Sequence, residues 1–227
     1  MGLLNDQHLE ALLDRLHAQS TGQNEAVTSY FMRRASEGTL DLSGFDEEIH
    51  RFMSDKLIAL DRDKAELCYQ LCRALRAKRV VEAGTSFGVS TLYLAAAVRD
   101  NVRRDGGAGL VIGTEHEPNK AKAARAHFAE AGLSDLIELR EGDLRQTLQN
   151  VGGPVDFMLI DIWTPMARPA LERVAPALRP GAIVVCDNTT QFRDAYREYF
   201  EFVNDRKNGF RTVTLPFDGG FELTVRD

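Results

Sequence analysis

Few residues of this chain can form disulfides or soft-metal sites. Its 227 residues include three cysteines, Cys68, Cys72 and Cys186, and no histidine or further cysteine stands beside them at the spacing of metal ligands. A metal site or a nucleophile is an alternative for such thiols, but buried, reduced core residues are the better interpretation. Cysteine used in this way is typical of a cytosol-like compartment, so we expect a cytoplasmic protein.

Positive charge and long apolar runs are also scarce. Lysine and arginine total 28 against 34 aspartate and glutamate residues, and the net charge of −6 argues against a broad surface for nucleic acid or anionic membranes. No apolar stretch approaches the ~20 residues of a membrane helix. Residues 1–6 lack the basic and apolar regions of a signal peptide. We therefore expect a small-molecule partner, without nucleic acid or membrane.

What the chain does contain is a regular alternation of strand and helix patterns from Arg79 onward. This alternation predicts an α/β fold with a mostly parallel sheet covered by helices on both faces. The end differs, because Asp218-Gly219 is a hairpin signal between two short apolar runs, so the sheet should finish with an antiparallel strand. Strands are expected at Val80–Ala83, Leu110–Thr114, Ile137–Arg140, Phe157–Ile160, Ala182–Cys186, Arg211–Leu215 and Phe221–Val225, and helices at Val89–Val98, Lys120–Ala131, Ala167–Ala177 and Gln191–Asn208.

The residues before this alternation are helical by pattern. Residues 1–55 carry one stripe of leucines, residues 38–44 look like a connection between helices, and Asp61–Ala77 is a further helix that leads into the central strand. No linker separates these segments, so we expect one domain, with 1–55 as a helical extension of an α/β core at 56–227. The extension should close over the substrate pocket and contribute to a homodimer, although packing on its own domain alone is nearly as well supported. The leucine stripe consists of Leu9, Leu12, Leu13 and Leu16.

The most informative stretch runs from Arg79 to Ser90 and has the pattern E-x-G-x-x-x-G. An apolar strand ends at Gly84, and a helix starts soon after Gly88, so free backbone N–H groups lie at the carboxyl edge of the sheet. Open α/β sheets bind nucleotide-like ligands at this edge. The glycine spacing differs from the G-x-G-x-x-G of dinucleotide folds, and the Gly-Lys-Ser/Thr of phosphate-binding loops is absent.

Acidic residues follow the next two strands. Glu115 stands at the tip of the second strand, where it can accept both hydroxyls of a ribose. Glu117 precedes Pro118 and is better interpreted as a helix-start acid. Asp143, after the third strand, can accept from an exocyclic amine such as that of adenine, or it can simply cap the next helix.

Two further strands are followed by residues whose side-chain oxygens can bind a metal. Asp161 follows the fourth strand, and Asp187-Asn188 follows the fifth. Hard oxygen atoms at neighbouring strand ends suit Mg²⁺ better than a soft metal. The alternative is that these residues only cap the helices that follow.

This ordered set resembles the class I S-adenosylmethionine-dependent methyltransferases, and among them the metal-dependent O-methyltransferases of the catechol and caffeoyl-CoA type, from about Asp55 to Val225. The resemblance implies a Rossmann-like, doubly wound seven-stranded sheet with one antiparallel strand, S-adenosylmethionine as cofactor, and Mg²⁺ or another divalent cation. Carried over by position, it implies these roles: Glu82, Gly84, Thr85, Ser86 and Ser90 around the methionine part, Glu115 on the ribose, His116 against the adenine, Asp143 and Leu144 at its rim, Trp163 flanking the cofactor, Asp161 in catalysis and cofactor contact, and Asp161, Asp187 and Asn188 as metal ligands.

One position departs from the resemblance. Relatives commonly have a lysine base directly after the tryptophan position, and this chain has Thr164 there. A threonine hydroxyl takes up a proton poorly at neutral pH. Either a metal alone acidifies the substrate, another residue such as Lys120, Arg168 or one of the N-terminal segment substitutes, or methyl transfer is weak. The prediction is an O-methyltransferase for a catechol-like or phenolic hydroxyl; a homologue that binds the cofactor with altered or lost catalysis is the alternative, and a dinucleotide oxidoreductase is disfavoured by the glycine spacing.

Overall fold

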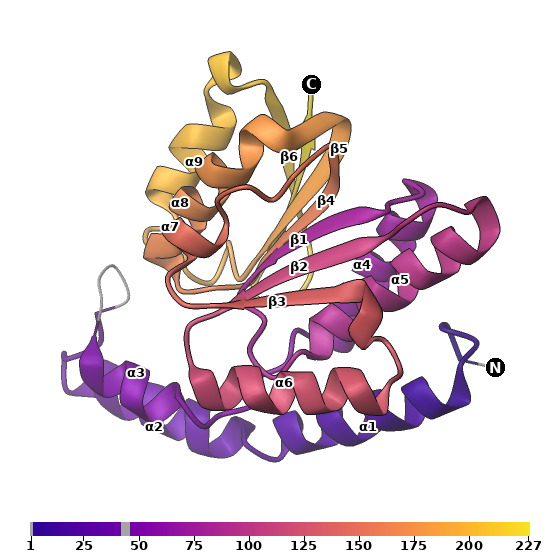
Figure 1. Cartoon of the computed structure of the whole chain (residues 1–227). Helices are drawn as coiled ribbons and strands as arrows, with labels where there is room; N and C mark the ends of the chain where they lie inside the picture. The colour runs from indigo at the N-terminus through magenta and orange to yellow at the C-terminus, as the bar shows by residue number, and fades with distance from the viewer. Residues whose placement is uncertain (1, 42–45) are drawn as a thin grey trace.

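The computed structural model describes residues 2–41 and 46–227, so the expected connection at 38–44 lies partly outside the described residues. The strands form one seven-stranded sheet in the order β3-β2-β1-β4-β5-β7-β6 (Figure 1). β7 runs antiparallel to both of its neighbours, and the pairs among β1 to β5 are parallel. This confirms the α/β fold with one antiparallel strand. The strands are β1 Arg79–Ala83, β2 Leu110–Glu115, β3 Ile137–Glu141, β4 Val155–Ile160, β5 Leu178–Asp187, β6 Phe210–Leu215 and β7 Phe221–Arg226.

Helices cover both faces of the sheet. Successive strand residues point to opposite sides, so both faces carry apolar side chains that the helices bury. Along β1, Val80 belongs to the apolar cluster that contains residues of α1, α4, α5 and α6, whereas Val81 belongs to the cluster of α7, α8 and α9. Phe157 and Met158 of β4 divide in the same way. The helices are α1 Gln7–Thr21, α2 Asn24–Ser36, α3 Glu47–Met53, α4 Arg62–Ala74, α5 Val89–Asp105, α6 Pro118–Glu130, α7 Leu144–Thr147, α8 Thr164–Val174 and α9 Arg197–Asn204.

The N-terminal helix α1 packs on its own domain. Its leucine stripe is buried in the apolar cluster that also contains α4 and α5. Arg15 of α1 forms an ion pair with Glu130 at 2.6 Å, and His17 lies 3.1 Å from the hydroxyl of Tyr93. Figure 1 shows α1 and α2 running alongside α6, at the outside of the fold. These contacts place α1 on its own domain, and the homodimer and the packing on this domain alone both stay predictions.

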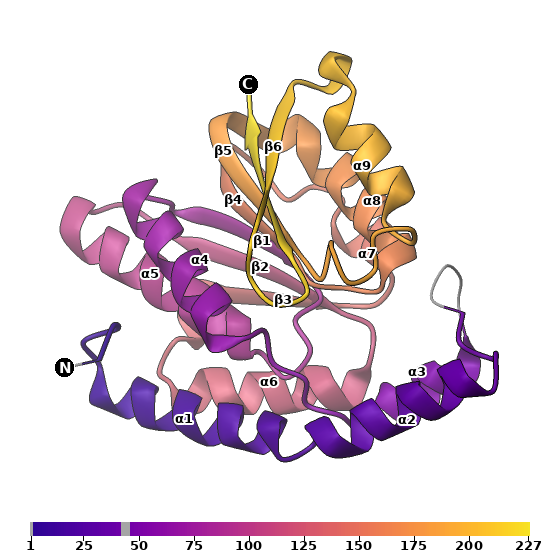
Figure 2. The same cartoon turned by 180° about the vertical axis from the view of Figure 1, so that it is seen from behind.

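The predicted helix over 191–208 is wrong in its first part. Residues 189–196 form turns, and the regular helix α9 begins only at Arg197. The C-terminal hairpin explains the delay, because the carbonyl of Gly219 accepts hydrogen bonds from the backbone N–H groups of both Thr190 and Gln191 at 2.9 Å. Figure 2 shows this β6–β7 hairpin at the edge of the sheet. Over the described ranges, none of the helices combines the length and the apolar character needed to cross a bilayer.

Candidate functional site

The loop after β1, residues 84–88 and called the β1 loop below, makes a close approach to the end of β4. Gly84 has a φ of +93°, and a Cβ atom built on it would lie 2.0 Å from the carbonyl oxygen of Asp161. The backbone N–H of Asp161 in turn donates to the carbonyl of Ala83 at 3.0 Å. Glycine is required here because a side chain would collide with the neighbouring strand end. Gly84 is therefore required for the packing of these two strand ends, and its predicted contact with the cofactor stays a prediction.

The same loop is held from inside by Glu82. Its fully buried carboxylate accepts hydrogen bonds from the hydroxyls of Thr85 at 3.0 Å, of Ser90 at 2.7 Å and of Thr91. Burial raises the pKa of Glu82, although the three hydroxyls oppose that shift. Glu82, Thr85 and Ser90 are therefore occupied in shaping the loop. Of the residues assigned to the methionine part, Gly84 and Ser86 keep exposed surface.

Glu115 ties the tip of β2 to this loop. Its carboxylate accepts the backbone N–H of Ser86 at 2.7 Å and that of Glu117 at 2.8 Å. Each carboxylate oxygen has lone pairs for a further donor, so the two hydroxyls of a ribose can still bind. The half-buried Glu115 and the exposed His116 next to it keep the positions that the ribose and adenine assignments require. Both assignments stay predictions.

Asp143 caps a helix, which was one of its two predicted roles. Its carboxylate accepts the backbone N–H of Arg145 at 2.8 Å at the start of α7 and forms an ion pair with the Arg145 guanidinium. These hydrogen bonds lower the pKa of Asp143 to about 2. An adenine amine would have to share this carboxylate with Arg145. Leu144, the other residue predicted at the adenine rim, is buried.

Asp161 and Asp187 lie at neighbouring strand ends, as the sequence predicts. The register pairs Ile160 with Cys186, so the residues that follow come side by side. Burial, followed by the charges of Asp187 and Glu82, raises the pKa of Asp161 to about 8. The Asp187 side chain is buried and meets a cation of the chain itself, which the sequence analysis did not identify.

That cation is Lys64, in the first turn of α4. Its side chain is 1% exposed, and its Nζ lies 2.8 Å from Asp187 Oδ1 and 2.9 Å from Asp61 Oδ2. A sequence signal for this role exists, since Lys64 stands on the stripe of Cys68 and Cys72, at i, i+4 and i+8 of one helix. A lysine on an apolar stripe requires a buried partner.

The predicted magnesium ligands do not fit a divalent ion in this arrangement. Lys64 occupies Asp187. Asn188 has a left-handed backbone with a φ of +57°, and its amide nitrogen lies against the hairpin turn, 2.9 Å from where a Cβ on Gly219 would stand. Within 2–41 and 46–227, no group of three or more histidine, cysteine, aspartate and glutamate side chains is arranged to hold a metal. The predicted set of Asp161, Asp187 and Asn188 contains an asparagine, which this criterion leaves out, so the magnesium site stays a prediction that the structure does not support.

The N-terminal extension reaches the site through α3. The ring of His50 stacks on Trp163, with centroids 4.8 Å apart and an interplanar angle of 28°. His50 Nδ1 lies 4.0 Å from a carboxylate oxygen of Glu117, and burial lowers the pKa of the imidazole despite this neighbour. Trp163 directly precedes α8, whose first residue is the buried Thr164. No sequence signal pointed to His50, because α3 and α8 meet only in the tertiary structure.

Similarity to known proteins agrees with this geometry. A family model described as a methyltransferase domain matches residues 81–189. The catechol O-methyltransferase of Mycobacterium tuberculosis is 33% identical over 132 residues, which cover 58% of this chain and 57% of that protein. The catechol O-methyltransferase of Niastella koreensis is 32% identical over 127 residues, which cover 54% and 53%. The chain thus matches little more than half the length of these curated relatives.

The solved O-methyltransferase TomG of Streptomyces achromogenes, in complex with S-adenosylmethionine, has a TM-score of 0.66 and 25% identity and covers 78% of this chain and 85% of that one. Residues 81–189 thus match a methyltransferase domain, and the chain is similar in fold to this S-adenosylmethionine-bound O-methyltransferase. A Bacillus cereus O-methyltransferase in complex with S-adenosylhomocysteine, at 20% identity and a TM-score of 0.67 over 79% of this chain and 88% of that one, shares the fold. The methyltransferase match at 81–189 contains the β1 loop, Glu115, Asp161 and Asp187.

Proposed function

We propose that the protein is a methyltransferase, which transfers a methyl group from S-adenosylmethionine to a hydroxyl oxygen of a small molecule with a catechol-like or phenolic ring. The observation that carries the proposal is the pairing of the β1 loop with Glu115, which leaves a carboxylate at the loop that can accept ribose hydroxyls. The relatives named catechol O-methyltransferase support the choice of acceptor.

The residues of the chain bind and orient in this reaction. When bound, the cofactor supplies a methyl group on a positively charged sulfur. In this proposal, the β1 loop and Glu115 hold the cofactor at the sheet edge, and the ring of Trp163, which follows β4, is held in place by stacking on His50. Methyl transfer needs an oxygen nucleophile in line and about 3 Å away, so positioning is the main contribution required of the protein.

The proton acceptor stays unassigned among several groups. Arg168 is an unsuitable one, because a guanidinium stays protonated at neutral pH, and the hydrogen bond to Glu172 at 2.9 Å raises its pKa further. Lys120 is better placed, since it lies over the ring of Phe87 in the β1 loop, and burial lowers its pKa although Glu115 and Glu117 oppose the shift. No step of the proposed reaction is assigned to magnesium, because Lys64 already occupies Asp187.

Two kinds of measurement test the function. Calorimetry should show binding of S-adenosylhomocysteine and none of NAD, and a panel of hydroxyl acceptors followed by mass spectrometry should show a mass gain of one methylene unit for at least one acceptor. The second candidate function, a cofactor-binding homologue without catalysis, is favoured by Thr164. Binding of S-adenosylhomocysteine without turnover of any acceptor would select that candidate, and absence of binding would refute both.

We also propose the cytoplasmic location that the cysteines suggest. Cys68, Cys72 and Cys186 are all free and buried, and burial raises the pKa of each thiol well above its ordinary value. Thiols of this kind are unreactive core residues, as expected where the environment is reducing.

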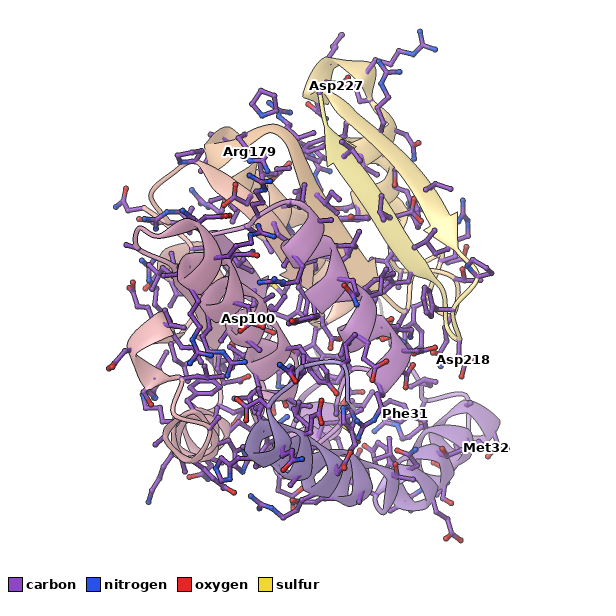
Figure 3. All side chains as sticks on the ribbon, turned by 90° about the vertical axis from the view of Figure 1, so that its right-hand side faces the viewer. Phe31, Met32, Asp100, Arg179, Asp218 and Asp227 are labelled. Carbon is purple, nitrogen blue, oxygen red and sulfur yellow. The ribbon has the colours of Figure 1, made fainter. Side chains whose placement is uncertain are left out.

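A homodimer is the remaining proposal, and the outer helix α2 supports it. Met32 is 68% exposed, and Phe31 beside it is half-buried. Figure 3 shows both on α2, with Met32 at the edge of the molecule. Light scattering should give twice the chain mass, and Met32→Glu should shift the protein toward monomer because a charge enters the interface. A wild type that is monomeric at every concentration would contradict the proposal. Truncation is unsuitable as a test, because α1 belongs to the core.

A further inference from the structure

A buried cation and two carboxylates meet where α4 begins. Lys64 is 1% exposed and bridges Asp187, at the end of β5, and Asp61, which precedes α4. A buried ammonium is costly unless it is paired, so this lysine is tolerated because both carboxylates approach within 2.9 Å. The two ion pairs fix the start of α4 against the carboxyl edge of the sheet.

This ammonium lies against Asp187, one of the strand-end acids predicted to bind a cation. Asp161 and Asp187 lie side by side at the ends of β4 and β5, and a divalent ion would need oxygen atoms of both. The ammonium of Lys64 stands 2.8 Å from Asp187 Oδ1. Two cations close to one carboxylate repel each other strongly in a buried site, so the lysine and a divalent ion compete for Asp187.

We propose that the ammonium of Lys64 replaces the divalent cation in this protein, as a built-in charge that holds Asp187 and the acidic strand ends. Cofactor binding then needs no metal. A metal that chelates two adjacent oxygens is also the physical reason to require a vicinal diol. Without such a metal, an acceptor with a single hydroxyl is sufficient. This conclusion about the acceptor rests on the proposed function.

The first experiment measures metal binding directly, with Mn²⁺ as the probe. The wild type should show no saturable Mn²⁺ binding in calorimetry, and its melting temperature should be the same in EDTA and in Mg²⁺. Lys64→Met removes the charge and leaves Asp187 unpaired, so this variant should gain Mn²⁺ binding and be stabilised by Mn²⁺. Lys64→Arg keeps the charge and should not bind. Lys122→Met, an exposed lysine on α6, is the matched control for the loss of one charge and should behave as the wild type.

The outcomes separate the two proposals. Saturable Mn²⁺ binding by the wild type overturns the inference, as does a folded Lys64→Met protein that neither binds Mn²⁺ nor differs in stability from the wild type. If Lys64→Met does not fold, Mn²⁺ binding by the wild type and by Lys64→Arg tests the inference: saturable binding by either protein overturns it. S-adenosylhomocysteine should bind equally well in EDTA and in Mg²⁺; binding only with metal refutes the inference and leaves the proposed function intact, whereas no binding under either condition refutes the proposed function alone.

Discussion

Replacement of Gly84 by alanine is expected to lower the free energy of unfolding by about 2–5 kcal/mol. Two costs add up at this position. A residue with a side chain is strained at a φ of +93°, and the new Cβ would stand 2.0 Å from the carbonyl oxygen of Asp161. To relieve the collision, the ends of β1 and β4 must move apart, and the site lies between them. Cofactor binding should therefore be lost together with stability.

Gly132→Ala is the matched control for this variant. Gly132 also has a positive φ, +64°, but a Cβ there would meet no atom within 4 Å. It should cost only the conformational strain, about 1–2 kcal/mol. Urea denaturation of both variants measures the difference. Equal losses of stability in the two variants would show that the approach of Gly84 to Asp161 is not a tight contact.

The elements of the sheet were predictable from the sequence because their signals are local. Each buried strand is a short apolar run with a turn after it, and Asp218-Gly219 marks the final hairpin within a few residues. The start of α9 was not predictable in this way. It depends on hydrogen bonds from Thr190 and Gln191 to Gly219, which the chain brings close only after the hairpin has formed.

The candidate site likewise contains residues that the sequence predicts and residues whose role depends on tertiary contacts. Glu115 at a strand tip follows from the order of strands and glycines, and the structure adds its bond to the loop through Ser86. Lys64 could not be assigned from its spacing to Asp61 alone, because an i, i+3 pair on a helix is usually an exposed pair. Its burial against Asp187 depends on how α4 docks on the sheet. The resemblance therefore predicts which acidic residues lie at the carboxyl edge of the sheet. It does not predict which cation neutralises their charge.

Glu115→Ala is expected to weaken the binding of S-adenosylhomocysteine by about 1.5–3 kcal/mol, which corresponds to roughly 10- to 150-fold in the dissociation constant. The ribose hydroxyls lose a charged acceptor. The N–H of Ser86 also loses its partner, so the loop that cradles the cofactor becomes less well fixed. Because Glu115 is only half-buried, its loss should reduce the affinity more than the stability of the fold.

Glu117→Ala removes an equal charge two residues further on and serves as the control. Glu117 lies at the start of α6, 4.0 Å from His50, and its carboxylate makes no bond to the β1 loop among the described residues. Its loss should change the affinity by less than about threefold, because a pair 4.0 Å apart contributes little. Circular dichroism of the three proteins confirms that each is folded before binding is compared.

Calorimetric titration of S-adenosylhomocysteine into the wild type, Glu115→Ala and Glu117→Ala tests the cofactor site most directly. The wild type and Glu117→Ala should bind with similar affinity, and Glu115→Ala should bind at least about 10-fold more weakly. Equal affinity of all three proteins would contradict the assignment of Glu115 to the ribose, and a wild type that does not bind S-adenosylhomocysteine would contradict the cofactor site altogether.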